Sequence, residues 1–175
     1  PKGVVASRAN LAAYVESARA RYEVAPGDII PVIARFSFSI SMFELMMPLA
    51  SGATVLMLDR QQVLDVATMS EVLTQVTFFH CGPSLLRKIL HHVDVTGVPP
   101  EAFAGVRHAS SGGDMVPADV LNRLHATFPN AEVFVIYGCS EVSCMGCTHF
   151  YPRGAPVERV FVGAPFENMV ARVLD

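Results

Sequence analysis

The strongest constraint on the fold is a regular alternation between short apolar runs and longer segments whose apolar residues recur every three or four positions. The short runs cover residues 29–33, 53–58, 76–81, 106–110 and 132–137. The helical patterns cover residues 8–22, 41–50, 62–74, 85–93 and 117–128. Alternation of this kind predicts an α/β fold with a largely parallel sheet and helices on both of its faces.

Local signals refine these elements. Ser7 can cap the helix at 8–22, and Pro117 suits the first position of the last helix. The β-branched apolar run at 53–58 predicts a strand in the core of the parallel sheet. Beyond about residue 150 the helical patterns fade. We therefore expect one partial domain over 1–175, with an α/β part at roughly 1–150 and the start of a β-rich segment at 151–175.

Composition excludes several functional classes. Apolar residues make up 51% of the chain, charged residues 17%, and the net charge is −3, so a nucleic-acid or anionic-membrane partner is not expected. No apolar run reaches the length of a membrane span. The chain starts at Pro1 without a hydrophobic leader, so we expect no signal peptide and a piece of a larger cytoplasmic protein.

Three loops follow predicted strands, where ligands bind in open parallel sheets. They are the segment after Ile33 and the segments 110–114 (S-S-G-G-D) and 137–141 (Y-G-C-S-E). A glycine pair lets the backbone approach a flat ligand, and Tyr137 offers a ring for stacking. Ser140 offers a hydroxyl to an anionic oxygen, and Glu141 offers an oxygen ligand to magnesium.

The cysteines raise a competing interpretation. Cys139, Cys144 and Cys147 have the C-x4-C-x2-C spacing of some iron–sulfur ligands, and His149 follows, which also brings zinc into question. Free cysteines more simply behave as small buried apolar residues. We favour the second interpretation.

Taken together and in order, the segments resemble the adenylate-forming superfamily, and nonribosomal peptide synthetase adenylation domains in particular. The matching segments are residues 1–4 (P-K-G-V), 10–11 (N-L), 36–44 (F-S-F-S-I-S-M-F-E), 82–86 (G-P-S-L-L), 111–114 (S-G-G-D), 137–141 (Y-G-C-S-E), 162–165 (V-G-A-P) and 172–175 (R-V-L-D). They span the whole chain, so the resemblance implies the activation of a carboxylic acid by ATP.

The resemblance assigns roles to individual residues. It implies ATP and Mg2+ as cofactors and Ser140 and Glu141 as catalytic residues, with Ser140 at the α-phosphate and Glu141 as the magnesium ligand. The residues expected to bind the nucleotide are Lys2, Gly112, Gly113, Asp114, Tyr137 and Gly138. The residues expected to line the acyl pocket are Ser39, Ile40, Phe43, His80, Ala109, Ser111, Ile136, Cys144 and Met145.

Ser39 departs from the family pattern. Relatives that take α-amino acids usually have Asp at this position, where it pairs with the substrate ammonium. A neutral serine cannot offset a desolvated cation. We therefore expect an acid without an α-ammonium group: an aryl, hydroxy, keto or fatty acid. An alternative is that another residue supplies the charge. The role of His80 also has two interpretations: it could face the substrate in the pocket, or it could be a hydrogen-bonded histidine of the core.

Three functions remain open from the sequence. The first is an adenylation domain that passes its acyl-adenylate to the thiol of a carrier protein in nonribosomal peptide or hybrid polyketide synthesis. The second is a stand-alone acyl- or aryl-CoA ligase, and the third is a non-catalytic α/β binding module. The family's glycine-rich phosphate loop, ribose-binding Asp and catalytic Lys fall outside the 175 residues, so we expect this segment alone to be inactive.

Overall fold

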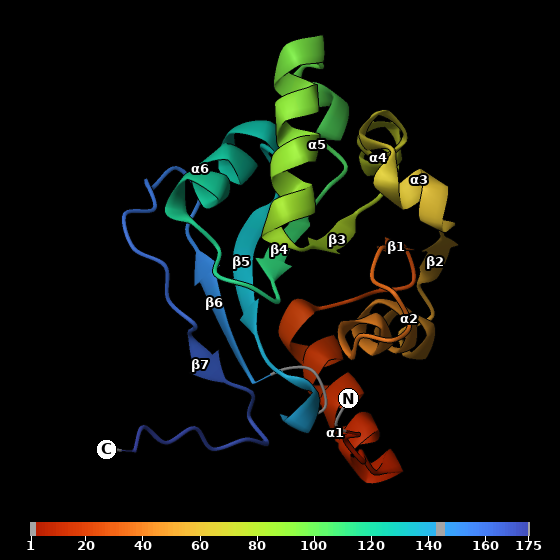
Figure 1. Ribbon diagram of the computed structural model, residues 1–175, viewed down its shortest axis with the longest axis vertical. Helices are drawn as coiled ribbons and strands as arrows, with labels where there is room; N and C mark the ends of the chain where they lie inside the picture. The colour runs from red at the N-terminus through yellow and green to blue at the C-terminus, as the bar shows by residue number, and fades with distance from the viewer. Residues whose placement is uncertain (1–2, 143–145, 175) are drawn as a thin grey trace.

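The computed structural model describes residues 3–142 and 146–174 and has the predicted α/β architecture (Figure 1). Within these residues, a five-stranded sheet has the order β3-β4-β5-β6-β7. Its strands are β3 (Phe78–Cys81), β4 (His108–Gly112), β5 (Glu132–Tyr137), β6 (Cys147–Tyr151) and β7 (Ala164–Pro165). β3, β4 and β5 are parallel, whereas β6 and β7 are antiparallel to their neighbours.

A smaller parallel pair extends this arrangement. It consists of β1 (Ile29–Val32) and β2 (Thr54–Met57). The backbone N–H of Thr77, just before β3, donates to the carbonyl of Ile29 at 3.0 Å. This bond sets the pair beside the larger sheet.

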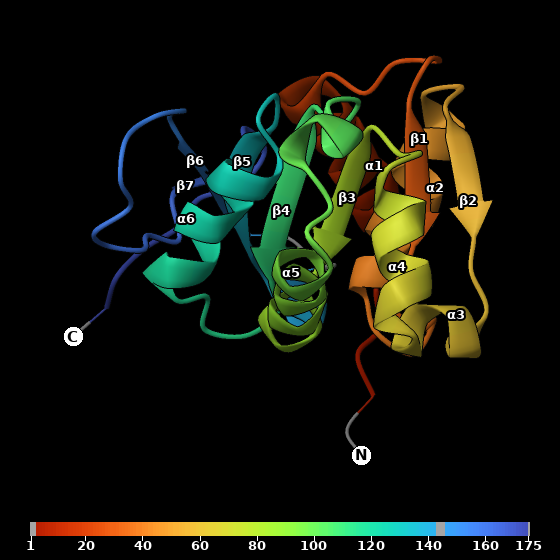
Figure 2. The same ribbon diagram turned by 90° about the horizontal axis from the view of Figure 1, so that it is seen from above.

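Helices cover both faces of the sheets (Figure 2). They are α1 (Arg8–Tyr22), α2 (Ile40–Ala50), α3 (Arg60–Leu64), α4 (Val66–Leu73), α5 (Pro83–Thr96) and α6 (Ala118–Thr127), with short 3-10 turns η1 (Pro100–Phe103) and η2 (Ser140–Val142). Helices α4, α5 and α6 lie on one face, and α1 and α2 lie on the other.

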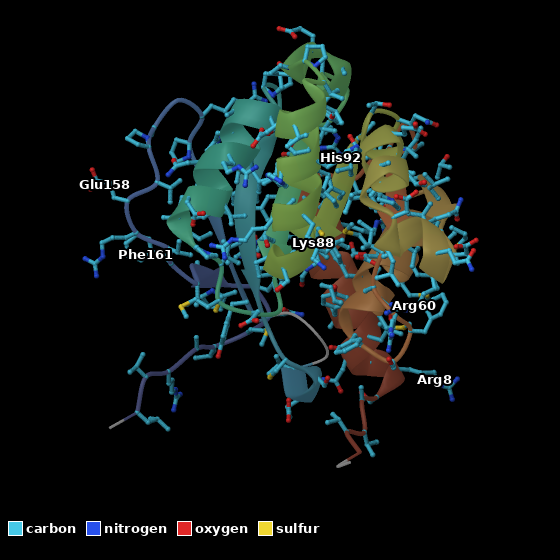
Figure 3. The ribbon with its side chains drawn as sticks, turned by 45° about the horizontal axis from the view of Figure 1, so that its top comes forward. Arg8, Arg60, Lys88, His92, Glu158 and Phe161 are labelled. Atoms are coloured by element: carbon cyan, nitrogen blue, oxygen red, sulfur yellow. The ribbon has the colours of Figure 1, made fainter. Side chains whose placement is uncertain are left out.

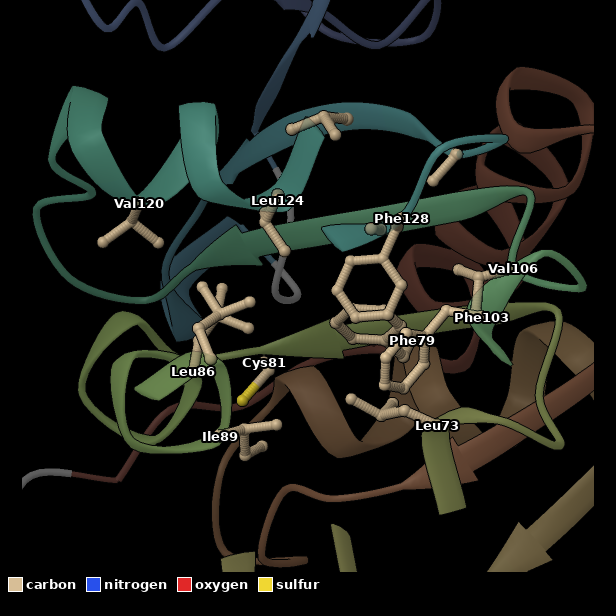
Figure 4. Close-up of a cluster of buried hydrophobic side chains, with 14 of the residues drawn as sticks. Leu73, Phe79, Cys81, Leu86, Ile89, Phe103, Val106, Val120, Leu124 and Phe128 are labelled. Atoms are coloured by element: carbon tan, nitrogen blue, oxygen red, sulfur yellow. The ribbon is translucent and has the colours of Figure 1, made fainter. Parts of the chain in front are cut away.

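The face under α4, α5 and α6 is an apolar core. Phe79 of β3 packs against Phe128 with ring centroids 5.0 Å apart, and Phe128 packs against Phe103 at 5.1 Å. Cys81 lies near Leu86 of α5 (Figure 4). Alternate strand residues point to opposite faces, so the neighbours of Phe79 and Cys81 in β3 point the other way.

The face under α1 and α2 holds an aromatic cluster centred on Tyr22. The ring of Tyr22 stacks on Phe134 of β5 at 4.8 Å and meets Phe43 of α2 edge-on at 5.7 Å. Its hydroxyl shares a 2.6 Å hydrogen bond with Thr148 of β6. This cluster fixes α1 and α2 against the strands whose ends form the site described below.

Most predicted elements are confirmed, and α1 and β5 have the predicted bounds. Ser7 caps α1, where its hydroxyl accepts from the N–H of Asn10 at 3.1 Å. β2 corrects the expectation of a core strand, because it has only one partner strand and Thr54 and Met57 are exposed.

Two helix predictions also need correction. The helix expected at 62–74 is broken into α3 and α4, because Asp65 has an extended backbone and accepts from the N–H of Ala67 as the cap of α4. Pro117 precedes α6 as its N-cap residue rather than occupying its first position. In both cases the residue that caps the helix lies just outside its first turn, so the helix begins one residue after it.

Candidate functional site

The carboxyl ends of β3, β4 and β5 border a cavity of about 590 Å³, here called the first cavity. Each of these strands ends next to a glycine: Gly82, Gly113 and Gly138. The residues that line the cavity are Ile33, Ala34, Phe38, Ser39, Ile40, Glu44, His80, Cys81, Gly82, Pro83, Ser84, Leu85, Gly112, Gly113, Asp114, Ile136, Gly138, Cys139, Ser140 and Glu141. All three loops expected from the sequence therefore contribute to one cavity.

The glycine pair after the middle strand has a steric explanation. A Cβ on Gly112 would lie 2.1 Å from the carbonyl oxygen of Ile136, closer than any side chain can be accommodated. Gly113 has φ of +79°, a left-handed conformation that favours glycine. The pair therefore lets β4 and β5 approach closely at their ends while the chain turns into the loop at Asp114.

His80 lies in the cavity wall and is only 5% exposed. Its Nδ1 is 3.0 Å from the hydroxyl oxygen of Ser110 on β4, and that hydroxyl donates to the carbonyl of Phe79 at 3.2 Å. Burial lowers the pKa of His80 to about 4, so its ring is neutral at physiological pH. Sequence reasoning proposed His80 for the pocket but did not find Ser110.

Glu44 of α2 is a second buried polar group of the same cavity, with 1% exposure. Its Oε2 accepts from the backbone N–H groups of Ile33 and Ala34, both at 2.8 Å. Its Oε1 is buried and has no partner among the described residues. Burial raises the pKa of Glu44 to about 8, so the carboxyl is largely protonated at neutral pH.

Ser39 and Ser140 connect two sides of the cavity. Ser39 precedes α2, and the hydroxyl of Ser140 in η2 donates to the hydroxyl of Ser39 at 3.4 Å. The neighbouring Glu141 is exposed on the cavity rim. Hydrogen bonds from its own backbone N–H and from the Cys139 side chain lower the pKa of Glu141, so it presents an ionised carboxylate.

A second cavity, of about 960 Å³, adjoins the first. The two share Gly113, Asp114, Ile136 and Gly138. Tyr137, which is 58% exposed, lines the second cavity. Opposite the strands, Glu158 and Phe161 contribute from the segment between β6 and β7, which Figure 3 shows beside α6. Tyr137 and Gly113 therefore border the same space, next to the cavity that Glu141 lines.

Three residues expected in the acyl pocket lie behind its wall. Phe43 is fully buried between Tyr22 and Phe78. Ala109 is fully buried in the core under α5 and α6, and Ser111 is buried with its hydroxyl bonded to the carbonyl of Cys81 at 2.8 Å. Side chains alternate along β4, so the side chain of Ser110 lies on the side of His80, and Gly112 lines the first cavity itself.

The remaining predicted residues divide into two groups. Ile40 and Ile136 line the first cavity as expected. Lys2, Cys144 and Met145 lie outside the described residues. Cys144 was part of the metal-binding alternative as well. Within the described part of the chain, no group of three or more His, Cys, Asp or Glu side chains could hold a metal ion.

Magnesium bound with a nucleotide has different requirements from zinc, because the phosphates and water supply most of its ligands. One ionised carboxylate at the rim of a cavity is then sufficient from the protein. The exposed carboxylate of Glu141, with its lowered pKa, fits this requirement.

Comparison with known protein families gives a match over the whole chain. The sequence profile of the family described as AMP-binding enzyme matches residues 1–175. Among curated proteins, the chain is 29% identical over 181 residues to an L-proline–[L-prolyl-carrier protein] ligase of Streptomyces coelicolor, and the match covers 100% of the chain and 33% of the relative. The chain spans about a third or less of the curated relatives it matches.

Solved structures give the same fold. The nonribosomal peptide synthetase FmoA3 in its AMPPNP-bound form matches with a TM-score of 0.83 and 27% identity, over 96% of this chain and 18% of that protein. A benzoate CoA ligase from Burkholderia xenovorans matches with a TM-score of 0.78 and 26% identity, over 95% of this chain and 33% of that one. No helix in residues 3–142 or 146–174 is long and apolar enough to cross a membrane.

Proposed function

This chain belongs to the AMP-binding enzyme family, and from that premise we propose that the protein activates a carboxylic acid with ATP, forming an acyl-adenylate that is passed to the thiol of a carrier protein. The observation that carries the proposal is the pair of adjoining cavities at the ends of β4 and β5. One cavity takes the nucleotide and the other takes the acid. Their shared rim at Gly113 and Gly138 is where the two reactants meet.

The second cavity suits the base of the nucleotide. Tyr137 offers an exposed ring for stacking, and the glycine turn at Gly113 leaves room for a flat ligand beside it. The other wall is apolar, with Val160 and Phe161. We assign adenine to this cavity, with Asp114 at its rim.

The reaction joins the two cavities. A carboxylate oxygen of the acid forms a bond to the α-phosphorus of ATP, and the bond from that phosphorus to the bridging oxygen breaks, so that pyrophosphate leaves. With ATP bound, Ser140 would donate its single proton to an α-phosphate oxygen instead of to Ser39. Glu141 would hold a magnesium ion, which supplies positive charge against the phosphates. Positioning and charge neutralisation are the main contributions that a protein makes to such transfers.

The first cavity suits an acid without an α-ammonium group. The position next to the reacting carboxylate is occupied by Ser39, a neutral group that shares a hydrogen bond with Ser140. An ammonium there would be desolvated without a counter-charge. This reasoning supports aryl, hydroxy, keto and fatty acids over α-amino acids.

A second candidate differs only in the acceptor of the acyl group. The similarity to a benzoate CoA ligase, with 26% identity, favours coenzyme A as an alternative thiol. The similarity to a carrier-protein ligase, with 29% identity, favours a carrier protein. Both acceptors require the same adenylate.

The test is ATP–pyrophosphate exchange by the purified full-length protein. The panel contains hydroxy, aryl, keto and fatty acids beside the common α-amino acids, and Glu71→Gln, an exposed substitution on α4, is the control variant. We expect exchange with at least one acid that lacks an α-ammonium group. Clear preference for α-amino acids contradicts the substrate assignment, and no exchange with any acid favours a non-catalytic binding module. Addition of holo-carrier protein or coenzyme A then identifies the acceptor.

A further inference from the structure

We propose that the first cavity selects a hydroxylated acid, whose chain or ring hydroxyl donates a hydrogen bond to Nε2 of His80, and that Ser110 is the positioning residue that fixes this histidine. The inference rests on the proposed function and narrows its acid classes to acids that carry a hydroxyl group on their chain or ring. Its basis is the direction of two consecutive hydrogen bonds, one from Ser110 to the carbonyl of Phe79 and one between His80 and Ser110.

The tautomer of His80 follows from Ser110. A serine hydroxyl has one proton, and Ser110 donates it to the carbonyl of Phe79 at 3.2 Å. Both contacts can be hydrogen bonds only if the Ser110 oxygen accepts from His80, whose Nδ1 lies 3.0 Å away, because a hydroxyl turned toward Nδ1 would lose the bond to Phe79. Nδ1 therefore carries the ring proton, and Nε2 of the neutral ring is left with a lone pair that accepts hydrogen bonds.

This lone pair has no partner within the part of the chain that the structure describes, although the ring lines the first cavity. Gly112 explains why the ring edge is open. A Cβ at Gly112 would lie 3.3 Å from Cε1 of His80, the atom between the two ring nitrogens. The glycine that shapes the turn therefore also leaves this edge of the imidazole uncovered.

Glu44 adds a second unpartnered polar atom to the same cavity. Its Oε2 accepts two backbone N–H groups, so the proton of its neutral form resides on Oε1, which has no partner among residues 3–142 and 146–174. His80 thus offers the cavity an acceptor, and neutral Glu44 offers it a donor. A hydroxyl can donate to the first group or accept from the second. A keto oxygen or an alkyl chain cannot donate to Nε2.

The matched experiment uses pairs of acids that differ by one hydroxyl: 4-hydroxybenzoate with benzoate, and 3-hydroxybutyrate with butyrate. Exchange is measured with the full-length protein and with its His80→Phe variant. The control is His91→Phe, which changes an exposed histidine on α5, the helix that follows β3. We expect one hydroxylated acid to exceed the acid that lacks the hydroxyl by about 10- to 100-fold in kcat/KM. The acid without the hydroxyl leaves the Nε2 acceptor of His80 unpaired.

His80→Phe keeps an aromatic ring but removes the acceptor. It should lower kcat/KM for the hydroxylated acid by about the factor that separates the pair, and change the deoxy acid by less than about threefold. Ser110→Ala should move His80 toward a mixture of tautomers, which the ¹⁵N chemical shifts of its ring report. A role in packing alone leaves those shifts unchanged. Ser110→Ala should also lower kcat/KM for the hydroxylated acid selectively.

Several outcomes overturn the inference while leaving the proposed function intact. One is exchange that does not distinguish the members of any pair. Another is an equal fall for both members in His80→Phe. A third is clear preference for 4-aminobutyrate over 3-hydroxybutyrate, which indicates an ammonium paired with an ionised Glu44. If no acid supports exchange, the proposed function and the inference fall together.

Discussion

The polar side chains at the two ends of the parallel strands differ in their hydrogen bonding. At the amino ends, Asp28, Thr77 and Arg107 directly precede β1, β3 and β4 and bond to one another. Asp28 accepts from the Arg107 Nε at 2.7 Å, from the Thr77 hydroxyl at 2.7 Å and from the Ala25 N–H at 2.8 Å. At the carboxyl ends, Oε1 of Glu44 and Nε2 of His80 make no hydrogen bond to any residue that the structure describes, and Glu141 is exposed.

This difference indicates that the amino ends stabilise the fold, whereas the carboxyl ends bind a ligand. Buried polar groups that satisfy one another hold a fold together, and buried polar groups that lack partners lower its stability. A protein retains the second kind where a ligand completes the hydrogen bonds. Substitutions at the amino ends should therefore change stability more than activity, and substitutions at the carboxyl ends should do the reverse.

The largest expected effect is at the carboxyl end. Glu141→Gln removes the ionised carboxylate at the cavity rim but keeps its shape, so we expect ATP–pyrophosphate exchange to fall by about 100- to 1,000-fold. The midpoint of thermal unfolding should stay within a few degrees, because the side chain is exposed. A loss of exchange that tracks a loss of folded protein would contradict the assignment.

The matching change at the amino end is Arg107→Met, which leaves Asp28 buried without its cation. We expect the free energy of unfolding in urea to fall by about 2 to 4 kcal/mol, with KM for ATP little changed. Arg123→Met is the control, because its ion pair with Asp94 on the exposed helix surface should contribute less than about 1 kcal/mol. Equal effects of the two substitutions would show that the Asp28 network is not special.

The pH dependence of stability should also differ between the ends. Burial raises the pKa of Glu44 to about 8, from 4.5, so the folded protein binds this proton more tightly than the unfolded chain. Stability should therefore fall as pH rises between about 4.5 and 8, by about 2 kcal/mol from pH 6 to pH 8. Glu44→Gln, which cannot ionise, should lack this component when urea unfolding is followed at both pH values.

Asp28 should show the opposite sign with a similar or smaller size. Burial raises its pKa, but the hydrogen bonds from Arg107, Ala25 and Thr77 outweigh it and lower the pKa to about 2, from 3.8. Its contribution is present above pH 4 and should be lost as pH falls toward 2, up to about 2 kcal/mol. Asp28→Asn should flatten the acid limb of the stability curve. An unchanged acid limb would mean that this network does not favour the ionised form.

The sequence predicts the elements of this fold well because apolar periodicity reports them directly. It is weaker where an outcome depends on neighbours. The run at 53–58 has core composition, but β2 lies at an edge, because within the described part of the chain β1 is the one strand that pairs with it. The segment 62–74 has helical periodicity, but the capping side chain of Asp65 interrupts it.

Prediction of individual site residues from the sequence has the same limit. The loops at Gly112 and Tyr137 were found, because glycine pairs and strand ends leave clear signals. Ala109 and Ser111, which the sequence assigned to the pocket, are not among the residues that line the first cavity, whereas Gly112 is. In a strand a shift of one residue moves every side chain to the opposite face. Ser110 and Glu44 were missed, because their importance depends on hydrogen bonds that cross between strands and helices.

The most direct test of the account is a crystal structure of the full-length protein with a non-hydrolysable acyl-adenylate analogue, the acyl sulfamate of adenosine with 4-hydroxybenzoate as its acyl group. We predict adenine against Tyr137 and Gly113 in the second cavity, and the acyl group in the first cavity with its hydroxyl within hydrogen-bond distance of His80 Nε2. Adenine bound away from Tyr137, or an acyl group outside the first cavity, would contradict the account.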